Sequence, residues 1–458
     1  MKVKNLIFLI VFFFSILFST IIINKNDKYE ISSDDRINHI IIKADIFRFY
    51  KEADYVKKKF ENGSSISELG QFYYSSFLPS KIIAIYYTLI SEDLFLDKND
   101  QNYDEFIVKN NNGKIGFVYI QIILFFLSIL YFYKVLKKKI GKIAIVVFLF
   151  LIIEPTIHQF NYSFYSESIF FSLTIFLISL IIKGSNNFSN AFFIGLVVGI
   201  LYLQRSIAIF YFFPILLFFI LEKKNFKYIL TYLSGLIIII LLLGIHNFSR
   251  AGVLQFTPYQ SKADLYIFMI PNVLKKKDPD LAKSDLSSID LKLDSFKTKN
   301  NLNLSKESDL LIYGNFMRNL SIQYLLNNPL ETIQVMIRKS LHALNFNPFE
   351  IYSFYKYEYK SVDHKLRYYK SDEHKKLLIV RIIYSLIVYS ICILGFFIMF
   401  KKKELFNIQV FLTLSFLYYL TLGGWHGNPR YLSVNIIFIS VFFGFGLIKL
   451  KEILKLKK

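Results

Sequence analysis

Long apolar runs alternate with short polar stretches along most of this chain, and charged residues are rare inside the runs. A hydrocarbon core of about 30 Å takes about 20 helical residues to cross, and the runs approach that length. The pattern therefore predicts an all-α polytopic membrane protein with about ten transmembrane helices. We place these helices at 6–23, 117–133, 143–157, 165–182, 190–204, 206–221, 228–245, 377–400, 405–422 and 432–449.

Lysine clusters mark one side of this membrane. They follow the runs at 117–133, 165–182, 206–221 and 377–400, and they fill the end of the chain. Positive residues gather on the cytoplasmic side, and one orientation puts all of these clusters there. The sequence thus predicts a multi-pass protein of the plasma (inner) membrane with both termini in the cytoplasm.

Five segments follow from this topology. They are a first anchor at 1–23, an external loop at 24–116, helices two to seven at 117–245, a larger external segment at 246–376, and three last helices with a basic tail at 377–458. We expect juxtamembrane helices in the first loop and a partly helical second segment.

Three stretches outside the membrane carry more specific signals. Pro79 to Ile90 reads as a short helix at the membrane surface. Lys275 to Asp309 is rich in Lys, Asp and Ser, which favours a mobile loop. Asn328 and Pro329 supply an N-cap and a first-turn proline, and they predict a helix through Leu344.

Composition narrows the class further. The chain has 458 residues, of which 54% are hydrophobic, and a formal charge of +21. Such a charge could indicate nucleic acid, but the lysines sit between apolar runs, where they orient membrane helices instead. Cys392 is the only cysteine, so the chain itself can form no internal disulfide.

Ionisable residues gather near the external ends of the predicted helices. Charges at membrane depth cost a few kcal/mol and usually face a cavity or a partner. The carboxylates are Asp34, Asp35, Asp45, Glu154 and Glu167, and the cationic side chains are Lys81, His158, Arg205, His246, Arg250 and Arg430.

Each of these residues also has a simpler explanation. Glu167 could stabilise a helix N-terminus, Arg205 could extend to the interface, and the three aspartates could be solvated loop residues. Glu154 and His158 are weak candidate ligands for a divalent metal ion, because they stand four residues apart with a proline between them.

Several local strings resemble the GT-C superfamily of membrane glycosyltransferases. The resemblance is closest to aminoarabinose transferases, protein mannosyltransferases and lipopolysaccharide-core sugar transferases. The strings are Asp45 to Ala53, Phe77 to Lys81, Ser166-Glu167, Gly195 to Gly199 with Gln204-Arg205, His246 to Gly252, Asn328-Pro329 and Arg430-Tyr431. The family's acid usually lies nearer the first span, so Asp34 and Asp35 stay open beside Asp45.

The resemblance implies an inverting transfer of a sugar from a polyprenyl-phosphate donor to a glycan, lipid or protein acceptor on the external (periplasmic) face of the cell envelope. Asp45, or Asp34 or Asp35, would be the general base, and Glu167 or Glu154 would stabilise the positive charge of the sugar. The donor phosphate needs cations, for which Lys81, Arg205, His246, Arg250 and Arg430 are candidates.

Two other classes fit parts of the pattern. An O-antigen-type polymerase or ligase would also combine many spans with a large external loop. A flippase or transporter of lipid-linked sugars would place ionisable residues near the bilayer midplane in two related halves, and neither feature is visible in the sequence.

Overall fold

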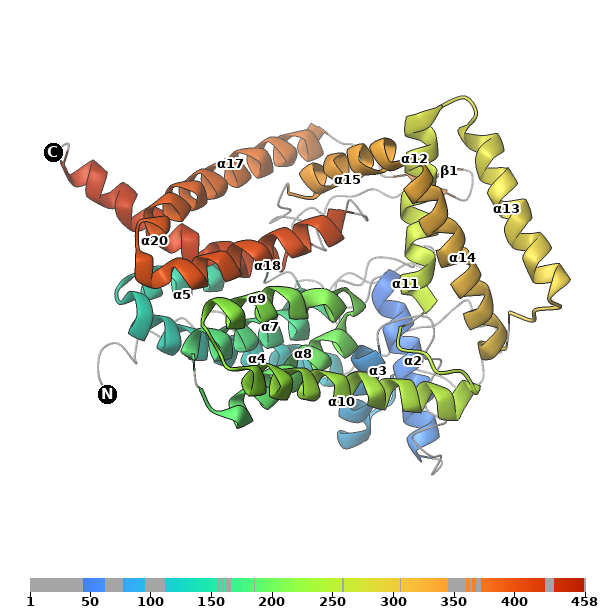
Figure 1. The fold of residues 1–458 in the computed structure, drawn as a ribbon, viewed down its shortest axis with the longest axis horizontal. Coiled ribbons are helices and arrows are strands. Elements are labelled where there is room, and N and C mark those ends of the chain that lie inside the picture. The colour runs from blue at the N-terminus through green and yellow to red at the C-terminus, as the bar shows by residue number, and fades with distance from the viewer. Residues whose placement is uncertain are drawn as a thin grey trace.

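A computed structural model of the chain is almost entirely helical (Figure 1). It describes residues 44–61, 77–94, 112–344, 360–367, 372–424 and 432–456, apart from short gaps at 155–156, 158–159, 162–165, 185, 258, 305 and 363–364. The all-α fold class predicted from the sequence is confirmed. Beside the helices, the described residues form one short antiparallel hairpin of β1 (Lys360–Val362) and β2 (Lys365–Arg367).

The apolar runs from residue 117 onward all become helices. The helices are α4 (Asn112–Ile140), α5 (Ile143–Ile153), α7 (Ser166–Lys183), α8 (Phe188–Gln204), η2 with α9 (Ser206–Tyr211 and Phe212–Leu221), α10 (Phe226–Ala251), α17 (Asp372–Phe400), α18 (Phe406–Gly424) and α20 (Asn435–Leu456). Within the described residues, 5 helices are long and apolar enough to cross a membrane, and four shorter helices are also apolar. The predicted first anchor lies outside the described residues, and the number of spans stays a prediction.

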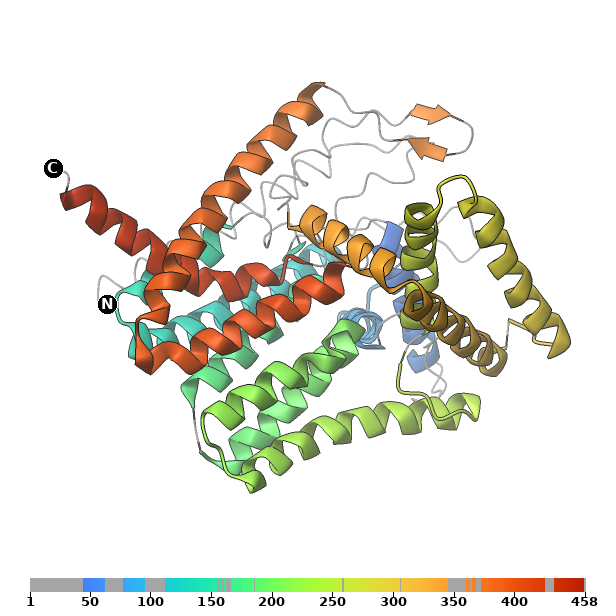
Figure 2. The same cartoon turned by 45° about the horizontal axis from the view of Figure 1, so that its top comes forward.

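Helix α7 lies at the centre of the bundle. Of the residues in the most apolar stretch of each helix, 78% are buried in α7, 33% in α10 and 28% in α17. Helices α10 and α17 lie on outer sides of the bundle (Figure 2). The buried hydroxyls of Ser172, Thr174 and Ser179 donate to carbonyls four residues earlier in α7. Polar groups inside the bundle therefore find partners within their own helix.

Helices α8 and α10 approach so closely that glycine is required between them. A Cβ atom at Gly195 would stand 2.0 Å from the Tyr232 carbonyl oxygen, and one at Gly199 would stand 2.5 Å from Cβ of Ile239. Small residues four apart let membrane helices pack backbone against backbone. This contact sets the two helices parallel, so that α8 and α10 end on the same side of the bundle.

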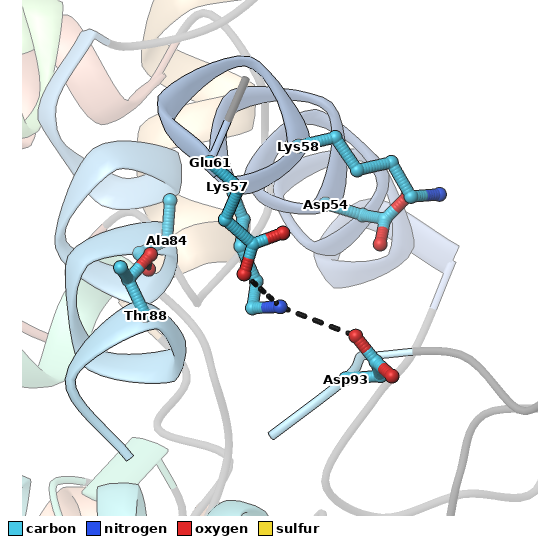
Figure 3. A network of polar contacts seen from close by, with 7 residues as sticks. All are labelled: Asp54, Lys57, Lys58, Glu61, Ala84, Thr88 and Asp93. Atoms are coloured by element: carbon cyan, nitrogen blue, oxygen red, sulfur yellow. Dashed lines mark hydrogen bonds and ion pairs between the residues drawn. The ribbon is translucent and has the colours of Figure 1, made fainter. Parts of the chain in front are cut away.

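Helices α2 (Ala44–Glu61) and α3 (Phe77–Leu89) lie at that same end. Phe49, Ala53 and Val56 of α2 are buried against α3 and the start of α4. Figure 3 shows Lys57 of α2 between two carboxylates, with its Nζ 2.7 Å from Glu61 and 3.1 Å from Asp93. Burial lowers the pKa of Lys57, but the hydrogen bonds and charges of these carboxylates raise it on balance. The pair to Asp93 ties α2 to the residues after α3. Helix α3 covers most of the stretch that was predicted to be a short helix, and its place at the membrane surface stays a prediction.

A layer of further helices stands across this end of the bundle (Figure 1). It consists of α11 (Tyr259–Asp264), a π-helical turn (Leu265–Met269), α12 (Ile270–Lys277), α13 (Ala282–Lys299) and α14 (Glu307–Asn327). From this layer α15 (Pro329–Ala343) runs back beside α18. The start of α15 at Pro329 agrees with the helix predicted from Asn328-Pro329.

The prediction of a mobile loop at Lys275 to Asp309 is wrong. Most of this stretch is helix α13, in which Ile289 and Leu293 are buried at 6% and 3% exposure. These apolar residues recur at helical spacing and face α12 and α14, while the Lys, Asp and Ser residues cover the outer sides. The prediction failed because it used the average composition of the segment, which is polar. The narrow apolar stripe of α13 is sufficient to pack this helix against its neighbours.

The close contact of α8 and α10 gives a first prediction. Gly195→Ala would push a methyl group into the Tyr232 carbonyl, a backbone atom that cannot rotate away. We expect a loss of about 1–3 kcal/mol in the free energy of unfolding, measured by denaturant titration of the purified protein in detergent. Phe193→Leu is the matched control, because Phe193 is 44% exposed on the same helix. Equal stability of Gly195→Ala and the parent protein would contradict the tight packing.

Candidate functional site

Glu167 and Arg205 form a buried ion pair where α7 begins and α8 ends. Nη1 of Arg205 lies 2.6 Å from Oε1 of Glu167, and the two side chains are 11% and 0% exposed. Among the described residues, Glu167 also accepts a hydrogen bond of 3.3 Å from the Ser166 hydroxyl. The two residues were predicted separately as site residues, and the fold brings them into direct contact.

The surroundings hold this pair in one place. The Gln204 side chain donates to the Ser166 carbonyl at 2.9 Å, which joins the same two helices a second time. Cζ of Arg205 lies 5.7 Å from the centre of the Phe170 ring, within the range of a cation–π interaction. A guanidinium held by a carboxylate and an aromatic face keeps donors in fixed directions, so Arg205 can bind a further anion with little loss of conformational freedom.

A second group of predicted residues meets around Phe77, at the start of α3. Nζ of Lys81 lies 4.8 Å from the centre of the Phe77 ring and 3.2 Å from Oε1 of Glu52 in α2. The ring of His246, near the end of α10, meets Phe77 edge to face with ring centres 5.6 Å apart. Lys81 and His246, which were predicted to bind phosphate, therefore share one aromatic neighbour.

Glu52 and Phe77 lie in strings that the sequence analysis singled out, but neither was predicted as a site residue. Glu52 is one residue before Ala53, inside a string already singled out, but its partner Lys81 stands in another helix. Phe77 precedes Lys81 by four residues, and this spacing places both on one side of a helix. The spacing alone could have predicted that Phe77 lies beside Lys81. The pairing of Glu52 with Lys81 could not be predicted, because it depends on how α2 and α3 pack.

Glu154 takes a structural partner at the end of α5. It is 2% exposed and accepts a hydrogen bond from the Tyr384 hydroxyl of α17. The other candidate metal ligand, His158, lies outside the described residues. Among the residues that the structure describes, no group of three or more His, Cys, Asp or Glu side chains could hold a metal ion.

The remaining predicted residues are placed only in part. Asp34, Asp35 and Arg430 lie outside the described residues. Asp45 lies in the first turn of α2 and Arg250 in the last turn of α10, and the structure describes their backbone only. Their roles stay predictions.

The fold and this site define a class of protein: a polytopic helical membrane protein with paired charges at one end of its bundle. Residues 107–246 match a protein-family model described as dolichyl-phosphate-mannose-protein mannosyltransferase. The match confirms the predicted resemblance to GT-C glycosyltransferases. The matched family consists of glycosyltransferases, which agrees with the predicted enzyme class. The matched segment contains Glu154, Glu167, Arg205 and His246. No curated protein matches the chain.

Solved structures with some likeness to this fold include an oligosaccharyltransferase and ArnT. The archaeal oligosaccharyltransferase AglB from Archaeoglobus fulgidus, in complex with an inhibitory peptide and a dolichol-phosphate, has a TM-score of 0.47 at 10% identity. That alignment covers 100% of this chain and 52% of AglB, so the chain spans about half the length of that protein. ArnT from Cupriavidus metallidurans has a TM-score of 0.32 at 10% identity, with 86% of this chain and 72% of ArnT covered.

The buried ion pair gives a second prediction. Arg205→Gln leaves the Glu167 carboxylate buried without its cation, and we expect a loss of about 3–5 kcal/mol in the free energy of unfolding. The double variant Glu167→Gln/Arg205→Gln removes both charges and should recover a large part of that loss. Thermal and denaturant unfolding in detergent measure both effects. If the loss in the double variant equals the sum of the losses in Glu167→Gln and Arg205→Gln, the two side chains do not stabilise each other.

Proposed function

We propose that this protein is a membrane glycosyltransferase that moves a sugar from a polyprenyl-phosphate-linked donor to an acceptor on the external face of the plasma (inner) membrane. The observation that carries the proposal is the family match over residues 107–246, a segment that includes the buried Glu167–Arg205 pair. The acceptor would be a glycan, a lipid or a protein.

The cations at one end of the bundle support a site for the donor phosphate. Lys81 and His246 meet at Phe77, and Arg205 ends α8 on the side where α10 also ends. A departing polyprenyl phosphate carries negative charge, which arginine and lysine stabilise through charge-assisted hydrogen bonds. Arg250 follows His246 by four residues in α10 and is a further candidate, as is Arg430.

The general base would come from the segment that contains α2. Helical spacing places position 45 on the same side of α2 as Phe49 and Ala53, which pack against α3. A carboxylate at Asp45 would then lie at the membrane end that carries Lys81. Asp34 and Asp35, which precede α2, are the alternatives.

For Glu167 we propose a role other than the stabilisation of the sugar's charge that the resemblance implied. A carboxylate with 0% exposure that already binds Arg205 is better suited to hold that guanidinium than to approach a sugar ring. We therefore assign Glu167 as a positioning residue for Arg205. Glu154, which accepts a hydrogen bond from Tyr384, would stabilise the bundle near the site.

The proposed function implies an orientation of the protein in the membrane. It is the one that the lysine clusters favour, with both termini in the cytoplasm.

The direct test supplies the purified protein with a synthetic polyprenyl-phosphate sugar and a mixture of glycan, lipid and peptide acceptors. We expect release of polyprenyl phosphate, and a loss of about 10²–10⁴ in rate for the triple variant Asp34→Asn/Asp35→Asn/Asp45→Asn, because a positioned general base contributes that much. The single Asp→Asn variants then identify the base.

Asp54→Asn is the matched control for these variants. Asp54 lies on α2, where it pairs with Lys58 at 2.5 Å beside the network in Figure 3. We expect it to keep nearly full activity. Full activity of the triple variant would contradict the base assignment. Movement of the lipid-linked sugar across proteoliposome membranes, without transfer, would favour a flippase instead.

A further inference from the structure

A pocket lies between the end of α10 and helix α14. The structure gives it a volume of about 420 Å³, within the range of about 300–1,000 Å³ that is common for small-molecule sites. The loop at 254–257 forms one wall and α14 the other, with Asn315, Arg318 and Asn319 on one side of the helix. Arg318 is the charged residue of the lining.

The loop wall is tied to the bundle near Arg205. Asn247 of α10 donates to the Gln255 carbonyl at 2.6 Å, and the Tyr202 hydroxyl of α8 donates to the Phe256 carbonyl. Tyr202 stands three residues before Arg205, so the pocket and the ion pair are attached to the same end of α8. The side-chain amide of Gln255 binds Thr257 at 2.6 Å, which fixes the polar groups of this wall.

Lys262 lies outside the pocket lining, on the short helix α11 that packs against α14, and it is close enough to Arg318 to feel its positive charge. Its side chain is 1% exposed, and its ammonium group has no hydrogen-bond acceptor among the described residues. Burial, and then the positive charge of Arg318, lower the pKa of Lys262 to about 8. Burial raises the pKa of the Asp264 carboxyl group, two residues further along, to about 7.

Other shielded lysines of the described part show what Lys262 lacks. Lys57 lies between Glu61 and Asp93, Lys81 binds Glu52, and Lys339 donates to the Phe268 carbonyl. A buried ammonium group without a partner is costly, and a neighbouring guanidinium adds repulsion. An anion bound next to Arg318 would offset both costs.

The polar lining indicates what else the anion carries. Gln255, Thr257, Asn315 and Asn319 offer amide and hydroxyl groups, which can donate to and accept from sugar hydroxyls. We propose that the pocket binds an anionic saccharide, a sugar unit with a phosphate or carboxylate group, through the charges of Arg318 and Lys262. The inference rests on the proposed glycosyltransfer, in which this saccharide would be part of the acceptor.

The test is a binding measurement on the full-length protein in detergent, by isothermal titration calorimetry with glucose 6-phosphate, glucose and inorganic phosphate as probes. We expect glucose 6-phosphate to bind more tightly than either of the others, and Arg318→Gln to weaken it at least about tenfold. Arg338→Gln, an equal change of charge at an exposed position of α15, should leave binding unchanged. Equal affinity for inorganic phosphate, or no effect of Arg318→Gln, would overturn the proposal.

Lys262→Met separates binding from folding. This variant removes a buried charge, so it should raise the melting temperature of the ligand-free protein and weaken the binding of glucose 6-phosphate. A lower melting temperature together with unchanged affinity would show that Lys262 only supports the fold, and would contradict the proposal.

A titration with polyprenyl phosphate distinguishes the two sources of an anion. If Arg318→Gln weakens the binding of polyprenyl phosphate as much as the binding of glucose 6-phosphate, the pocket binds the donor and the acceptor assignment is wrong. Failure of the transfer assay would overturn the proposed glycosyltransfer and leave the binding result intact. Active transfer with unchanged binding in Arg318→Gln would overturn the pocket alone.

Discussion

The ion pair of Glu167 and Arg205 is the interaction on which this end of the molecule depends. A carboxylate at 0% exposure in a membrane bundle is stable only with a cation beside it, and Arg205 stands 2.6 Å away. The pair fixes the start of α7, the most buried long helix, to the end of α8. Helix α8 also packs closely against α10 at Gly195 and Gly199. The position of α8 therefore places the end of α10 beside the ion pair.

The helices outside the bundle take their position from these ends. Phe77 brings α3 against His246 of α10 and also packs against the cluster formed by Ala263, Leu293 and Leu311. Tyr202 and Asn247 hold the loop that leads into α11. Charged side chains that are far apart in the sequence therefore gather at one end of the bundle, which is the end where we propose that the donor phosphate binds.

The sequence was most informative where one physical requirement acts over many residues. Hydrocarbon thickness requires long apolar runs, so the apolar helices from α4 to α10 and from α17 to α20 could be predicted within a few residues at most ends. It failed at α13, where average polarity concealed the stripe with Ile289 and Leu293. Glu167 and Arg205 could each be singled out as a charge at membrane depth. Their contact, and the isolation of Lys262, could not be predicted, because both depend on which helices pack together.

A structure of the complex with a polyprenyl-phosphate sugar, determined by electron cryomicroscopy, would show where the donor binds. We expect the donor phosphate at the end of the bundle formed by Arg205, Lys81 and His246. We also expect a carboxylate of the segment around Asp45 about 3 Å from the position of the attacking acceptor atom. Density for the phosphate at the opposite end, beside the lysine clusters, would contradict the proposed donor site.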